Sequence, residues 1–166
     1  MKSLVALLML AAPLMAAAAD VPDASFYKHA AEGGMFEVDA GNLAQQKGNT
    51  QAVKDFGSMM VTDHSAANDK LKALAASKNI SLPTSASMGQ MATKAKLDVL
   101  SGETFDKSYI KSQVKAHRDT IVLFKKEIAS GQDPDAKAFA KATLPTLQGH
   151  LKKIKAIAAD EGVAIK

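Results

Sequence analysis

Apolar residues recur every three or four positions along four stretches of the chain, over residues 21–46, 50–78, 105–129 and 134–160. This spacing is typical of amphipathic helices that turn one apolar stripe toward a shared core. Each stretch holds about 25 to 30 residues and therefore predicts a helix of roughly 40 Å, at a rise of 1.5 Å per residue. The pattern thus favours a bundle of long helices.

Short polar breaks separate the first stretch from the second and the third from the fourth. In the first break, Gly48 is suited to the left-handed position that follows many helix ends. Asp23 is a candidate cap for the first helix, and Asp133 before Pro134 marks the start of the fourth. Pro145 lies inside the fourth stretch, where a missing backbone donor predicts a kink.

The connection over residues 79–103 is much longer than either break and contains Pro83, Gly89, Gly102 and one short helical candidate at about residues 90–100. A connection of this length in a compact bundle usually crosses from one end to the other. The two flanking helical hairpins should therefore point in opposite directions.

A weak internal repeat supports this arrangement. A shift of 83 positions aligns residues 70–76 with the similar residues 153–159, and aligns Gly48 with Gly131. Chance similarity between two helices rich in alanine and lysine is the alternative. We predict an all-α, ferritin-like four-helix bundle made of two pseudo-repeated helical hairpins joined by a long crossover.

One polar residue interrupts the apolar stripe of each predicted helix: Glu37, His64, His117 and His150. Measured along the helices, these residues lie roughly 18, 22, 22 and 27 Å from the nearer hairpin turn. Because the hairpins point in opposite directions, all four should meet within a band about 10 Å deep near the middle of the bundle.

Three imidazoles and one carboxylate suit a borderline divalent cation, with zinc, copper and iron all compatible. We predict metal ligation by Glu37, His64, His117 and His150. Asp63 points about 100° away from His64 on the helix, so we expect it to orient a neighbouring imidazole or to pair at the surface. A buried, hydrogen-bonded polar cluster without metal is the alternative.

Other candidate ligands fit the pattern less well. His29 lies off the stripe that carries Glu37 and should face solvent. Met60 lies on its stripe and should fill the core, while Met59, Met88 and Met91 should pack or lie in the connection.

The first residues have the pattern of an export signal. Lys2 precedes an apolar run, and residues 17–19 are three alanines. We expect residues 1–19 to be a signal peptide and residues 20–166 to form the bundle domain in the periplasm or cell envelope. The chain has no cysteine, so neither a disulfide nor a lipoprotein anchor is available. Its net charge of +4 comes mainly from scattered lysines, which does not favour nucleic-acid binding.

Several motifs resemble a known family. The chain has Phe-Glu at residues 36–37, Asp-His at 63–64, Phe-Asp at 105–106 with Tyr109 and His117, and Leu-Pro at 144–145 with His150. From about residue 25 to 158 it is similar to a ferritin-like family of secreted bacterial proteins, domain of unknown function 4142, whose members are often labelled outer membrane proteins. The resemblance implies a helical bundle of the envelope with no established activity. Di-iron ferritins carry Glu-x-x-His, whereas Val61 precedes His64 by three residues here, so a single metal ion is expected.

We therefore expect an envelope bundle that binds one transition-metal ion, in metal handling or a stress response. A metal-dependent oxidoreductase would need an open ligand position. A metal-free interaction or small-ligand module would use the lysine faces to meet an acidic partner. The mature chain should have no transmembrane segment, and neither the oligomeric state nor outer-membrane association follows from the sequence.

Overall fold

The computed structural model describes residues 23–165, which contain five α-helices and no strand. They are α1 (Ala24–Lys47), α2 (Gln51–Ser77), α3 (Met88–Asp98), α4 (Gly102–Ser130) and α5 (Pro134–Asp160). The all-α class and the four long helices are confirmed, and α3 is the short helix expected inside the crossover. The expected signal peptide, residues 1–19, lies outside the described residues.

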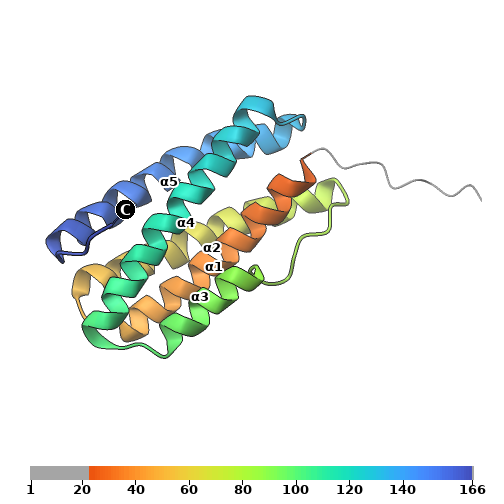
Figure 1. Ribbon diagram of the computed structural model, residues 1–166. Helices are drawn as coiled ribbons and strands as arrows, with labels where there is room; N and C mark the ends of the chain where they lie inside the picture. The colour runs from red at the N-terminus through yellow and green to blue at the C-terminus, as the bar shows by residue number, and fades with distance from the viewer. Residues whose placement is uncertain (1–22, 166) are drawn as a thin grey trace, which may run out of the picture.

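The four long helices form two antiparallel hairpins, α1 with α2 and α4 with α5, and α3 lies alongside α1 in the crossover (Figure 1). Asp106 near the start of α4 accepts hydrogen bonds from the backbone N–H groups of Asn49 and Thr50, both at 2.9 Å. At the other end, Asp23 accepts from the backbone N–H groups of Gln132 and Asp133. The two hairpin turns therefore lie at opposite ends of the bundle, as the long crossover predicts.

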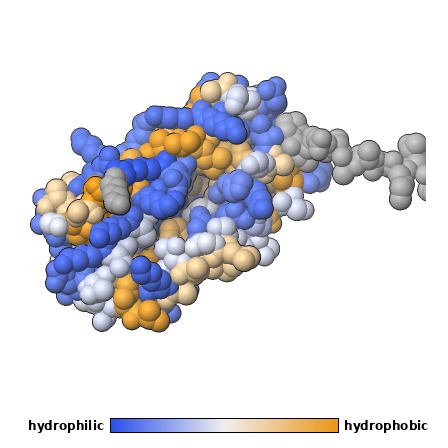
Figure 2. All heavy atoms as spheres, in the orientation of Figure 1, coloured by the Kyte–Doolittle hydropathy of each residue, from blue (hydrophilic) through white to orange (hydrophobic). Residues whose placement is uncertain are grey.

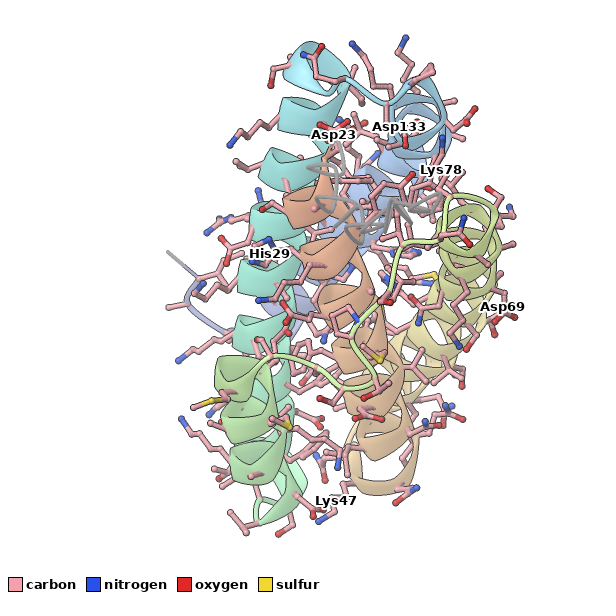
Figure 3. All side chains as sticks on the ribbon, turned by 90° about the vertical axis from the view of Figure 1, so that its right-hand side faces the viewer. Asp23, His29, Lys47, Asp69, Lys78 and Asp133 are labelled. Atoms are coloured by element: carbon pink, nitrogen blue, oxygen red, sulfur yellow. The ribbon has the colours of Figure 1, made fainter. Side chains whose placement is uncertain are left out.

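Figure 3 shows the two ends of the bundle, with Asp23, Lys78 and Asp133 at one end and Lys47 at the other. Lys78, which follows α2, forms an ion pair with Asp133 at 3.0 Å. Asp133 also accepts a hydrogen bond from the Tyr27 hydroxyl at 2.8 Å. One carboxylate thus ties α1 and the end of α2 to the turn between α4 and α5.

Side-chain caps explain where three helices begin. Thr50 accepts a bond from the backbone N–H of Val53 at the start of α2. Ser87 and Gln90 form a reciprocal capping box on α3. Asp133 accepts from the first backbone N–H groups of α5, whose first residue is Pro134, as the sequence predicts.

Two terminal residues behave differently from expectation. Asp23 precedes α1 but makes no side-chain cap bond, because its carboxylate bonds to the turn between α4 and α5 instead.

Gly48 is not left-handed; its φ is −53°. Glycine is needed there for space, since a Cβ would lie 2.6 Å from the carbonyl oxygen of Ala44. Pro145 lies inside α5, which continues past it, and the kink stays a prediction.

The buried apolar residues form two clusters, one toward each end of the bundle. Their boundary lies at the histidines. On α2, His64 lies between Met60 of one cluster and Leu71 of the other. His117 lies between Val114 and Ile121 on α4, and His150 between Leu147 and Ile154 on α5, in the same way. A polar layer therefore crosses the middle of the bundle.

The internal repeat also relates the first and last residues of the helices. A shift of 83 positions carries both ends of α2 onto the ends of α5, and carries the last residue of α1 onto the last residue of α4. The polar layer does not follow this relation, since the shift carries His64 onto Leu147. The hairpins are alike as scaffolds and differ in the side chains that they bring to the centre.

Candidate metal centre

Three imidazoles from three helices meet at the centre of the polar layer: His64 of α2, His117 of α4 and His150 of α5. One ring nitrogen of each lies within 4.8 Å of the others. All three side chains are buried, with 7%, 1% and 4% of their surface exposed. The structure therefore brings together the three histidines that the sequence placed on apolar stripes.

Hydrogen bonds assign the protons on two of the rings. His117 Nδ1 lies 3.0 Å from the carbonyl oxygen of Gln113, so it must carry the hydrogen and donate. His150 Nε2 lies 2.8 Å from Asp63 Oδ2 and donates likewise. The remaining nitrogens, His117 Nε2 and His150 Nδ1, then carry lone pairs and face each other at 3.4 Å. Two acceptors at this distance repel each other unless a cation or a proton lies between them.

The third ring contributes an unpaired nitrogen. His64 Nε2 is buried and has no hydrogen-bond partner among the described residues. An unsatisfied buried polar atom destabilises a fold by about 1 to 3 kcal/mol, and such atoms are uncommon without a functional reason. The centre thus offers three nitrogen atoms that a metal ion would satisfy together.

The electrostatics keep the rings neutral. Burial, followed by the neighbouring His117 and His150, lowers the pKa of His64 to about 3. Burial lowers the pKa of His117 to about 4. Burial also lowers the pKa of His150, although Asp63 opposes the change. At neutral pH no proton competes with a metal for these nitrogens.

Glu37 of α1 lies beside the centre but not within the group of three imidazoles. Its Oε1 is 3.8 Å from His117 Nδ1, the nitrogen already directed at the Gln113 carbonyl, and its Oε2 has no partner among the described residues. Burial raises the pKa of Glu37 to about 8, so the metal-free protein holds it as the neutral acid at pH 7. The sequence predicted its level in the bundle, and the structure places it behind His117.

Two buried polar residues were not singled out as site residues by sequence reasoning. Tyr109 and Gln113 are fully buried on α4; the Tyr109 hydroxyl has no partner among the described residues, and the Gln113 amide lies beside Glu37, whose pKa it acts to lower. With His117 they recur every four residues along one helix, a periodicity that could have revealed them. The buried polar layer therefore extends from the imidazoles toward Tyr109.

The candidates that fit the pattern less well lie at the surface, in the apolar core or on α3. His29 is exposed, as expected, and its Nδ1 is 3.2 Å from Ser25 Oγ. Met60 is buried in the core and Met59 packs against it, also as expected. Met88 and Met91 belong to α3, with 82% and 44% of their surface exposed, so neither packs into the core.

One known protein family matches most of the chain. The family described as a domain of unknown function, DUF4142, matches residues 9–157. The chain belongs to the DUF4142 family. This membership agrees with the resemblance carried by its motifs, and no curated protein matches the chain.

Solved structures share the fold of this DUF4142 protein. A DUF305 protein from Streptomyces coelicolor, described as secreted, is 14% identical with a TM-score of 0.75, over 90% of this chain and 99% of that one. A DUF305 fragment from Deinococcus radiodurans is 11% identical with a TM-score of 0.73, over 83% and 95%. CopM in its Cu(I)-bound form is 14% identical with a TM-score of 0.70, over 85% and 98%. At these identities the likeness shows a shared helical bundle.

No helix in residues 23–165 is both long enough and apolar enough to cross a membrane.

Proposed function

We propose that this DUF4142 protein binds a single transition-metal ion, copper(I) first among the candidates, and handles that metal in the cell envelope. The observation that carries the proposal is the set of three buried nitrogens: the facing pair on His117 and His150, and the unpartnered Nε2 of His64. Neutral imidazoles are good ligands for copper and zinc, and a metal ion at their meeting point would remove the repulsion between the facing lone pairs.

The groups behind the rings support the same role. Ligating histidines usually donate their other ring N–H to a carboxylate or a carbonyl, which fixes the ring and makes its free nitrogen more basic. His150 has Asp63 in this position and His117 has the Gln113 carbonyl. We assign Asp63 and Glu37 to positioning of the imidazoles, with Glu37 behind His117 where it would offset the charge of a bound ion.

Charge favours a monovalent ion. Three neutral imidazoles bring no negative charge, and burying a divalent ion costs more than burying a monovalent one. CopM, a neighbour in fold at 14% identity, is described as bound to Cu(I) and to silver, which makes copper the first metal to test. Zinc remains the comparison, because ionisation of Glu37 would supply one balancing charge.

The site is better suited to holding or passing on an ion than to catalysis. All three imidazoles are at least nine-tenths buried, so a substrate could not approach the metal without movement of the helices. The apolar run that follows Lys2 supports export of the chain, and one neighbour in fold is described as secreted. Metal handling outside the cytoplasm fits both points.

Anaerobic titration with Cu(I) against a chromophoric chelator tests the proposal. One equivalent should bind tightly to the unaltered protein, and none to His64→Leu or His117→Leu at the same chelator concentration. Leucine is chosen because it continues the apolar stripe and fills the core. His29→Ala is the control and should bind one equivalent. Full retention of binding by both leucine variants would refute the site, as would a failure of the unaltered protein to bind Cu(I) or zinc.

A further inference from the structure

A groove runs along the surface between α1 and α4, next to the start of α3 (Figure 2). It comprises two adjoining hollows of about 680 and 430 Å³. Gly33, Gln90 and Thr120 line both hollows, and so join them into one groove. His29 lines the first hollow, and Figure 3 shows it where α1 adjoins α4.

A small cavity of about 20 Å³ lies deeper in the bundle, and His64 is one of its lining residues. This volume is close to that needed for one water molecule. Gly33 and Thr120 line this cavity as well as the groove. We call these two shared residues the neck between the solvent-exposed groove and the cavity at His64.

The neck includes a residue that has no side chain. A Cβ at Gly33 would lie 3.8 Å from Thr120 Oγ1 and 3.9 Å from Gln90 Nε2. The capping box holds Gln90 in place, because its Oε1 accepts bonds from the backbone N–H and the hydroxyl of Ser87. A hydroxyl and an amide thus border the neck, and Gln90 covers it from α3.

We propose that a metal ion reaches the three imidazoles through the neck between Gly33 and Thr120, and that His64 is the first ligand it meets. This inference rests on the proposed metal binding. His64 Nε2 is unpartnered and ready to accept an ion that has lost its water. The side chain of Gln90 must swing aside for passage, which gives α3 a role in controlling exchange.

A second path past Glu37 leads to a less useful place. Glu37 lines the 430 Å³ hollow and contacts His117. The nitrogen it contacts is Nδ1, whose hydrogen is directed at the Gln113 carbonyl, so it has no lone pair to offer. The neck, in contrast, leads to His64, whose Nε2 has no hydrogen-bond partner among the described residues.

Exchange kinetics test the neck. The full chain is loaded with Cu(I) and mixed with an excess of chromophoric chelator, and release is followed by absorbance. Gly33→Leu should slow both loading and release at least tenfold, since its side chain would fill the neck, and should change the equilibrium affinity less than threefold. Thr120→Ala should speed release. Ala73→Leu, an exposed change of the same kind on α2, is the control and should release at the unaltered rate.

Release from Gly33→Leu at the rate of the unaltered protein would overturn the neck while leaving metal binding intact. Failure of the unaltered protein to bind Cu(I) would overturn the proposed function and the route together. Gly33→Ala guards against misfolding of the larger variant, because its Cβ makes only ordinary contacts. It should slow release by a smaller factor, and the absence of any slowing in either variant would count against the route.

Discussion

Glu37 should make the metal-free protein less stable as the pH rises above 6.5, and Glu37→Gln should remove this contribution. Burial raises the pKa of Glu37 from 4.5 to about 8. The folded protein therefore binds a proton that the unfolded chain has already released. A group of this kind stabilises the fold below its unfolded pKa, and the stabilisation is lost as the pH rises toward the folded value.

The magnitude follows from the size of the shift. Between the two pKa values the free energy of unfolding falls by about 1.4 kcal/mol per pH unit. From pH 6.5 to 8 the loss should be about 2 kcal/mol. The histidines act with the opposite sign and in another window, because their folded pKa values are depressed. Their contribution is present above pH 6.5 and is lost as the pH falls below it. Burial also raises the pKa of Glu127, to about 7, so Glu127 loses stabilisation in part of the same window, and the difference between the unaltered protein and Glu37→Gln isolates Glu37.

Urea denaturation with metal chelated, followed by circular dichroism at 222 nm, measures the effect at half-unit steps of pH. The unaltered protein should lose about 2 kcal/mol more than Glu37→Gln across the window, and Glu37→Gln should be the more stable of the two at pH 8. Glu103→Gln alters an exposed carboxylate paired with Lys107 and should leave the slope unchanged. Equal slopes in Glu37→Gln and the unaltered protein would refute a buried, neutral Glu37.

Two further changes test the scaffold. Gly57→Ala should destabilise the fold by about 1 to 3 kcal/mol in urea denaturation, because the new Cβ would lie 2.7 Å from both the Gly41 carbonyl oxygen and the Ala44 Cβ; an unchanged midpoint would show that α1 and α2 do not approach so closely. Asp106→Ala should lower the free energy of unfolding by about 3 kcal/mol, since it removes two hydrogen bonds to the turn between α1 and α2. A decrease below about 0.5 kcal/mol, which is typical of surface substitutions, would contradict that role.

Periodicity was sufficient to predict the helices because every long helix has one apolar face. The stripes carrying His64 and His117 predicted α2 and α4, and the Asp-Pro pair at 133–134 predicted the first residue of α5. The long connection predicted opposite hairpin directions. The level of the three histidines followed from helix length and direction, and the structure brings their rings together.

Contacts between side chains were harder to predict. Glu37 has the right level but faces the protonated nitrogen of His117, which depends on rotamers and not on spacing. Gly48 is required by the close Ala44 carbonyl and not by its own φ, which no local rule reveals. Asp23 bonds to a turn more than one hundred residues away. These details arise from tertiary packing, which a one-dimensional pattern does not contain.

X-ray absorption at the copper edge of the Cu(I)-loaded protein tests the central claim most directly. The three imidazoles predict about three nitrogen neighbours at about 2.0 Å, similar to metal–imidazole distances in zinc sites, with the outer-shell scattering of histidine rings. The spectrum should contain no sulfur neighbour, because Met88 and Met91 are exposed on α3, which supplies none of the imidazoles, and Met60 is packed in an apolar cluster. A first shell dominated by sulfur, or one without imidazole scattering, would contradict metal binding at His64, His117 and His150.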